Sequence, residues 1–245
     1  MIITNFPINV SFVSTPRFAK YELGKKIPIE DGYSDFNLAT HVGDDSDRVE
    51  QNRQFLIEEY HLPSAPKYLE QIHSDTCLQY EDEKSVGDAL ISDKPNQVCA
   101  VLTADCLPIF ITDSAGTQVG VAHAGWKGLL AGVIESLAKG FGDFDPNDLI
   151  VHFGPAISQE NFEVGEEVRD QFMQKNPALK QAFKENGDKY LLDLYLSARI
   201  ILNALGIRRI TGGAECTFKQ ENKYFSYRRD GTQSGRMAHL IWINH

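Results

Sequence analysis

The sequence predicts a single α+β domain in which mixed β-sheets lie in layers flanked by helices, and three observations support this. Short apolar or β-branched runs follow one another through the centre of the chain, and a tight turn joins one pair of them, which favours antiparallel or mixed sheets. Helical and strand patterns alternate without regular βαβ order. The 245 residues contain no internal repeat, low-complexity tract or Pro/Ser-rich linker, so we expect one domain over residues 1–245.

The N-terminal part is predicted to hold one strand, one long loop and one helix. The strand is expected over residues 8–13. Residues 14–37 are polar and contain glycine, and loops of this length in compact domains are often functional. Asp45 or Ser46 is expected to cap a helix that runs to about Tyr60.

The central segment has the strongest strand pattern. We expect strands over residues 98–103, 107–112 and 118–123, with a hairpin turn at 113–116 between the last two. Leucine, valine and isoleucine then recur at helical spacing, which predicts a helix over residues 126–139.

The C-terminal part mixes both element types. Apolar periodicity predicts helices over residues 166–175 and 191–205. Short apolar or aromatic runs predict four more strands, over residues 149–153, 207–211, 223–227 and 237–243.

Composition excludes several classes of function. The formal net charge of -10 opposes general nucleic-acid binding, which needs a basic face that contacts phosphates. No run approaches the roughly 18 to 20 apolar residues of a membrane span, and the first residues lack the basic and apolar regions of a secretory signal. The four cysteines are few and irregularly spaced, which indicates reduced thiols and a cytoplasmic protein.

His123 ends a predicted strand, and a glycine-flanked turn leads from it into the next helix. Strand ends that face such a turn are common positions for functional sites, because the helix N-terminus offers free N–H groups. Gly125 and Gly128 would let the backbone approach a ligand closely, and Lys127 adds a cation. The same pattern also fits a tight turn with a surface lysine.

Two further residues can complete a metal site with His123. Cys106 lies between two predicted strands at a break before Pro108, and His73 follows an apolar stretch. Alone, each would more often be a buried inert thiol or an ordinary histidine. Together, two imidazoles and a thiolate suit zinc or copper, and three protein ligands leave one position open for water, phosphate or substrate. Cys77 could instead close the site as a fourth, structural ligand.

The chain resembles the YfiH/laccase-domain family, also called multicopper polyphenol oxidase-like. The resemblance extends over nearly the whole chain and includes the motif His-Ala-Gly-Trp-Lys-Gly at residues 123–128. The other matching blocks are residues 37–45, 52–53, 71–74, 87–91, 104–108, 154–157, 162–165, 225–231 and 235–237.

The resemblance implies a central β-sandwich, similar to the catalytic domain of a cysteine-dependent deamidating toxin. It implies one metal, usually zinc, bound by His73, Cys106 and His123 in a catalytic pocket. The associated activities are phosphorolysis of adenosine, inosine and methylthioadenosine and deamination of adenosine. An older assignment is copper-dependent polyphenol oxidation, and some members are linked to editing of peptidoglycan precursors. The expected partners are therefore a small nucleoside and phosphate.

Several side chains are candidates for substrate binding. Phosphate needs cations, and the candidates are Arg17, Lys127, Arg228 and Arg229, with Asn37 in the first matching block as a further substrate-binding candidate. Adjacent Arg228 and Arg229 on one strand would point to opposite faces, so at most one is expected in the pocket. Each of these cations could equally be a solvated surface residue.

Two carboxylates and one altered loop complete the candidate site. Asp88 and Asp105 could transfer protons or serve in turns and caps. The segment from Thr15 to Lys20 lacks the double glycine that family members often carry, so substrate preference is expected to differ.

Three alternatives stay open. Cys106 could be a metal-free nucleophile with His123 as its base, which would favour acyl transfer or amide hydrolysis. Copper oxidation is disfavoured, because multicopper chemistry needs about ten histidines and the chain has 7. A structural metal clip is the non-enzymatic possibility. The sequence does not determine the oligomeric state.

Overall fold

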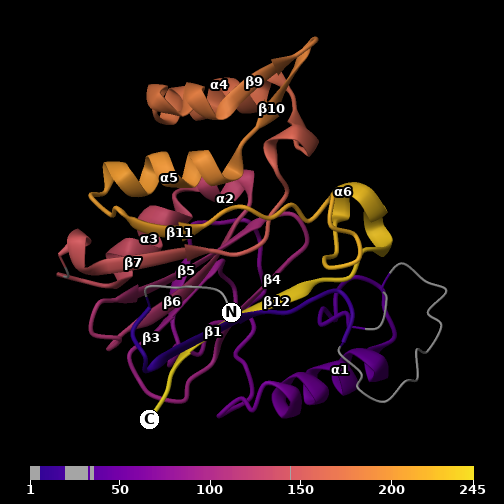
Figure 1. Cartoon of the computed structure of the whole chain (residues 1–245), viewed down its shortest axis with the longest axis vertical. Helices are drawn as coiled ribbons and strands as arrows, with labels where there is room; N and C mark the ends of the chain where they lie inside the picture. Colours follow the sequence, from indigo (N-terminus) through magenta and orange to yellow (C-terminus); the bar gives the residue numbers. More distant parts are fainter. Residues whose placement is uncertain (1–5, 20–32, 34–35, 144) are drawn as a thin grey trace.

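The computed structural model describes residues 6–19, 33, 36–143 and 145–245. It is an α+β fold in which two β-sheets pack face to face and helices cover both outer faces (Figure 1). The prediction of layered mixed sheets is thus confirmed, and so is the β-sandwich that the resemblance implied. Within the described part of the chain, no helix has the length and apolar character needed to cross a membrane.

The smaller sheet joins the two ends of the chain. β1 (Val10–Ser14) and β4 (Cys99–Thr103) pair antiparallel with β12 (Met237–Ile243), which lies between them. All residues of β4 and β12 are buried, because β12 is covered by neighbours on both faces. Strands buried on both faces are continuous apolar runs rather than alternating patterns, which is why both were predictable from the sequence.

The larger sheet has six strands in the order β11-β7-β5-β6-β3-β2. It is antiparallel in its centre and parallel at both edges, where β11 pairs with β7 and β2 with β3. The strands are β2 (Cys77–Gln79), β3 (Ala89–Ser92), β5 (Leu107–Asp113), β6 (Val119–Ala124), β7 (Leu149–Phe153) and β11 (Arg209–Gly212).

Alternate side chains of the larger sheet enter two different cores. On β5, Leu107, Ile109 and Ile111 face the helices, whereas Phe110 faces the smaller sheet. Helices α2 (Trp126–Ala131), α3 (Val133–Gly140) and α5 (Leu194–Ala204) pack on the first side. Helix α1 (Ser46–Glu59) covers the outer face of the smaller sheet.

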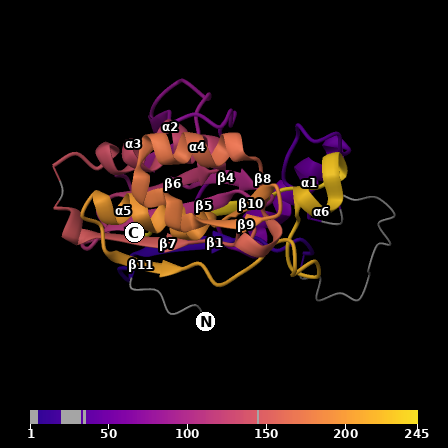
Figure 2. The same ribbon diagram turned by 90° about the horizontal axis from the view of Figure 1, so that it is seen from above.

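The remaining elements lie at the periphery. Seen down the long axis, α4 (Glu166–Lys175) and α5 overlie the larger sheet, while α6 (Tyr227–Asp230) stands to one side (Figure 2). A third sheet consists of β8 (Glu163–Val164), β10 (Lys189–Leu192) and β9 (Phe183–Asn186). Short 3-10 helices span Pro146–Asp148, Gln159–Asn161, Pro177–Ala182 and Gly231–Gln233.

Two predicted helices differ from the observed ones. The helix expected over residues 126–139 is divided into α2 and α3 at Gly132, whose φ of 111° is left-handed and interrupts the helix. The helix expected over residues 191–205 begins only at Leu194. Asp193 accepts a hydrogen bond from the Leu196 amide as an N-cap, so the two residues before it belong to strand β10.

The strand predicted over residues 223–227 is wrong. Tyr224 and Phe225 are buried in a small cluster with Ala104 and Met237 but pair with no strand, and α6 begins at Tyr227. Arg228 and Arg229 therefore lie on one turn of helix, and the argument that they point to opposite faces of a strand fails. Most of the predicted 14–37 loop, including residues 20–32, lies outside the described residues.

Candidate metal centre

Three side chains from different elements converge on one point. His73 lies in the segment before β2, Cys106 in the bend between β4 and β5, and His123 near the end of β6. Their ligand atoms all lie within 4.8 Å of one another, and Cys106 Sγ is 3.9 Å from Nε2 of His73. Among the described residues no other group of three or more such side chains gathers in this way.

Asp88 holds two of the three side chains in place. Its buried carboxylate accepts hydrogen bonds from the backbone amides of His73 at 3.0 Å and Ser74 at 2.6 Å. The same carboxylate lies 2.8 Å from Nδ1 of His123, which leaves Nε2 of that ring free to face the other two side chains. Burial would raise the pKa of Asp88, but the hydrogen bonds with His123 and Ser74 lower it to about 2.

Left-handed backbone conformations shape the two loops of the site. His73 has a φ of 62° and Asp105, next to Cys106, a φ of 88°. Such values are uncommon for residues other than glycine and persist where the surroundings fix them. Asp105 is fixed by hydrogen bonds from Thr217 Oγ1 and the Arg228 amide, both at 2.6 Å. The turn that presents Cys106 is thereby tied to α6.

Gly125 leaves the space that the site needs. A Cβ atom at this position would lie 2.8 Å from Cys106 Sγ and 3.0 Å from Cδ2 of His73, closer than such contacts normally allow. Gly125 also precedes α2 as its N-cap residue. The glycine in the turn after His123 is therefore a requirement of packing at the site, and it brings the backbone close to the ligand side chains.

The electrostatics favour charge separation between Cys106 and His123. Burial would raise the pKa of the thiol, but the charge of His123 and hydrogen bonds with both histidines hold it below its ordinary value. Burial would likewise lower the pKa of His123, whereas the charge of Cys106 and the bond to Asp88 raise it. A thiolate is the form of cysteine that binds metal, and two imidazoles with one thiolate fit zinc or copper.

Cys77 does not belong to this group of ligands. Its side chain packs against the core on the helix side of the larger sheet, near Gly140 at the end of α3. Burial raises the pKa of its thiol to about 12. Among the described residues the set therefore has three members, and a fourth position left open is the arrangement typical of catalytic rather than structural zinc sites.

Two predicted substrate-binding cations lie on helices next to the segments that carry the centre. Lys127 is exposed on the first turn of α2, with its Nζ over the Trp126 ring. Arg228 is exposed on α6, where its side chain donates to the carbonyl of Glu163 and its backbone amide to Asp105. Arg229 instead binds backbone carbonyls of the same C-terminal segment.

The other two predicted substrate-binding residues have structural partners. The side-chain amide of Asn37 is buried, and both of its N–H groups and its oxygen are engaged, the latter with the amides of Ala39 and Arg236. Arg17 forms an ion pair of 3.5 Å with Asp230 and lies over the Phe225 ring. Contact of either residue with a substrate stays a prediction.

Arg236 is a residue that the sequence analysis did not single out. It precedes β12, is largely buried, and feels the charges of Cys106 and Asp105. Its Nη1 donates to the carbonyls of Ser234 and Gly235, and its guanidinium lies over the ring of Tyr227. An arginine placed directly before a largely apolar strand was the available signal, because burying a guanidinium needs a reason.

Comparison with known proteins gives likenesses over most of the chain. The family model described as multi-copper polyphenol oxidoreductase laccase matches residues 28–244. The purine nucleoside phosphorylase YfiH of Escherichia coli is 46% identical over 214 residues, which are 86% of this chain and 87% of that protein. A purine nucleoside phosphorylase of Haemophilus influenzae is 42% identical over 244 residues, 98% of this chain and 96% of that protein.

Solved structures agree with this. A Neisseria meningitidis protein superposes with a TM-score of 0.88 at 38% identity, covering 98% of this chain and 97% of that one. A Bacillus licheniformis hypothetical protein YfiH gives a TM-score of 0.84 at 26% identity, covering 96% and 93%.

Proposed function

The chain belongs to the multi-copper polyphenol oxidoreductase laccase family, and we propose that within it the chain is a zinc-dependent purine nucleoside enzyme. Its reactions would be phosphorolysis of adenosine, inosine and methylthioadenosine, and deamination of adenosine. The observation that carries the proposal is the open set of His73, Cys106 and His123. The names of the two bacterial relatives support the choice of purine nucleosides.

His73, Cys106 and His123 would hold the zinc ion, with His123 oriented by Asp88. Bound zinc supplies Lewis acidity and lowers the pKa of a water molecule toward about 7. The same donor set accepts copper. Multicopper oxidation is less well supported, because the described residues offer a single group of this kind.

In phosphorolysis, a phosphate oxygen bonds to C1′ of the ribose while the bond from C1′ to the base nitrogen breaks, and the base leaves with a proton. The phosphate needs cations at the rim of the centre, and Lys127, Arg228 and Arg236 are the candidates. Tyr227 exposes half of its surface beside Arg236, so its ring is available to stack on a purine.

In deamination, water replaces the exocyclic amino group of adenosine and ammonia leaves. Asp88 and Asp105 act as positioning residues in either reaction. The carboxylate of Asp88 is occupied by His123 and the His73 loop, and that of Asp105 by Thr217 and the Arg228 amide. A small nucleoside and phosphate are thus the proposed partners, and the cytoplasm the proposed location.

One observation favours a second function, that of a metal-free cysteine hydrolase. Asp88, His123 and Cys106 lie in the order of an acid, a base and a nucleophile, with 2.8 Å between the first two. The thiolate of Cys106 would attack an amide carbonyl, and His123 would give its proton to the leaving amine. Water would then release the acid, as in editing of peptidoglycan precursors.

The deciding experiment measures free base and inosine released from adenosine, with and without phosphate, by the native protein and by protein treated with a strong chelator. We expect base release to require phosphate, to stop after chelation and to return with zinc. If base release returned with copper but not with zinc, the metal of the centre would be copper. Full activity after chelation, together with a covalent adduct on Cys106, would overturn the zinc enzyme in favour of the hydrolase.

A further inference from the structure

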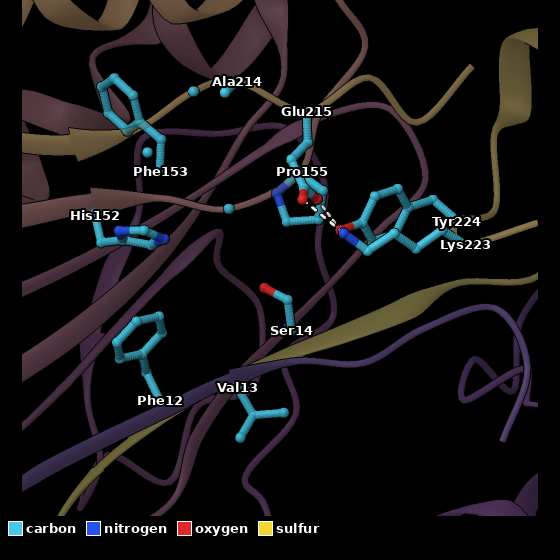
Figure 3. Close-up of a pocket in the computed structure, with 13 residues that line it drawn as sticks. Phe12, Val13, Ser14, His152, Phe153, Pro155, Ala214, Glu215, Lys223 and Tyr224 are labelled. Carbon is cyan, nitrogen blue, oxygen red and sulfur yellow. Dashed lines mark hydrogen bonds and ion pairs between the residues drawn. The ribbon is translucent and has the colours of Figure 1, made fainter. Parts of the chain in front are cut away.

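A cavity of about 610 Å³ opens between the two sheets at the edge formed by β1, β7 and the segment after β11 (Figure 3). None of its lining residues belongs to the metal centre. Its volume lies within the range of small-molecule sites, roughly 300 to 1,000 Å³. The rings of Phe12 and His152 lie together at one end with their centroids 4.9 Å apart, whereas the ring of Phe153, on the opposite face of β7, packs on Tyr195.

His152 presents a hydrogen-bond acceptor to this cavity. Assigning the single hydroxyl proton of Thr211 to its 3.2 Å hydrogen bond with the carbonyl of Val151 makes Nδ1 of His152, 2.9 Å from the same hydroxyl oxygen, the donor to it. In the neutral imidazole Nε2 is then unprotonated, and it has no hydrogen-bond partner among the described residues. The neutral form is favoured because burial lowers the pKa of His152 to about 4.

The other polar groups of the lining are already committed. Glu215 at the opposite end forms an ion pair of 2.6 Å with Lys223 and accepts a hydrogen bond from Tyr224. The hydroxyl of Ser14 lies 2.8 Å from Nδ1 of His239. The charged side chains of the lining therefore pair with one another, and among the described lining side chains Nε2 of His152 is available to accept from a ligand.

We propose that this cavity is a binding site for a neutral, planar heteroaromatic molecule that donates an N–H group to Nε2 of His152 and stacks against Phe12. A free purine base belongs to this class, and choosing it as the ligand rests on the proposed function, of which it is a product. The ring of Phe12 offers a surface to one face of the base, while the acceptor distinguishes bases with an unsubstituted N–H edge from those without one.

Calorimetric titration with adenine tests the site on its own in Cys106→Ala protein, in which the metal centre is disabled. We expect adenine to bind this protein, and His152→Phe in the same background to weaken binding at least about tenfold, since the ring remains and the acceptor is lost. N6,N6,9-trimethyladenine, which has no N–H, should bind at least tenfold more weakly than adenine. Thr211→Val removes the hydroxyl that fixes the tautomer of His152, so it should also weaken adenine binding. This variant tests the proposal if His152→Phe does not fold.

Two results would overturn the proposal. One is that adenine fails to bind Cys106→Ala protein, whether or not it binds the wild type. The other is equal binding of adenine to the variants with and without the His152 acceptor. The proposed function fails separately: if adenosine yields no base in the presence of phosphate while adenine still binds at His152, the cavity stands and the phosphorolysis does not.

Discussion

His123 and His152 lie on the same six-stranded sheet and are almost equally buried, at 4% and 6% exposed, yet they are prepared for different chemistry. His123, on β6, has a carboxylate partner in Asp88. His152, two places across the sheet on β7, has a hydroxyl partner in Thr211. Each partner engages Nδ1 and leaves Nε2 to face an open site.

The difference shows that the partner, rather than burial, decides what a buried histidine can do. Burial pushes the pKa of both rings down, but at His123 the charge of Cys106 and the bond to Asp88 reverse that effect. At His152 burial prevails, and the charge of Glu215 opposes it only in part. One region is thus suited to a thiolate and a cation, and the other to neutral recognition.

The largest expected effect comes from removing any one ligand of the centre. If His73, Cys106 and His123 act as one unit, His73→Ala, Cys106→Ala and His123→Ala should each lose zinc and lower phosphorolysis by about 1,000-fold or more. Zinc content by atomic emission and base release from adenosine are the measurements. His152→Phe is the matched control and should retain zinc.

The pattern among the three variants separates the two proposed functions. In the hydrolase, Cys106 and His123 are essential, whereas His73 has at most an auxiliary role. A His73→Ala protein that keeps nearly full activity would therefore contradict the zinc enzyme.

Asp88→Asn should have the next largest effect. Asparagine keeps the shape but removes the charge that orients His123, and loss of such a supporting carboxylate typically costs about 10- to 100-fold in metal affinity. Ser74→Ala is the control, because it removes one hydrogen bond to Asp88 and leaves the contact with His123 intact. Competition with a chromogenic chelator gives the zinc affinity. A lower melting temperature with unchanged zinc affinity would reduce Asp88 to a scaffold role.

Much of the fold could be predicted because its signals are local. Strands β4, β5, β6 and β12 are buried on both faces and form continuous apolar runs, and α4 begins and ends where its periodicity predicts. The run at residues 223–227 resembles a strand in sequence because Tyr224 and Phe225 are buried in a cluster, and aromatic content alone does not distinguish such a cluster from a strand.

The site was less accessible to sequence reasoning, since its geometry depends on long-range contacts. Nothing local indicates that the carboxylate of Asp88 reaches the His73 loop, 15 residues earlier, and His123, 35 residues later. The grouping of the three ligands was therefore a chemical possibility that the family resemblance strengthened. Arg236 was overlooked because its proximity to Cys106 arises only when β12 pairs with β4.

Replacing His152 should have a smaller effect, on how the free energy of unfolding depends on pH. Replacing an exposed histidine should not change this dependence. The pKa of His152 is lowered to about 4, so the folded protein binds fewer protons than the unfolded chain between that value and about 6.5. Stability is complete above pH 6.5 and falls as the pH approaches 4. In His152→Phe this fall should be shallower by up to about 1.4 kcal/mol per pH unit.

Urea unfolding at several pH values between 4 and 7 measures this difference in the free energy of unfolding. The control is His245→Phe, which removes an exposed histidine two residues after the end of β12. His239 is buried in both proteins and contributes to both curves alike. Parallel curves for wild type and His152→Phe would mean that His152 is protonated as easily in the folded state as in the unfolded chain.

The smallest expected effect is that of Cys77→Ser on metal content, which should be none. Cys77 is the cysteine nearest to His73 in the sequence, but its side chain packs beside Gly140 and lies outside the ligand group. Replacing it should therefore leave the fourth coordination position unchanged. Some stability should be lost, because a buried thiol becomes a hydroxyl without an assigned partner. Zinc bound per protein at saturation is the measurement. A fall from one zinc to none in folded Cys77→Ser protein would mean that the site closes around four protein ligands, and a closed site leaves no position at which phosphate or nucleoside could meet the metal.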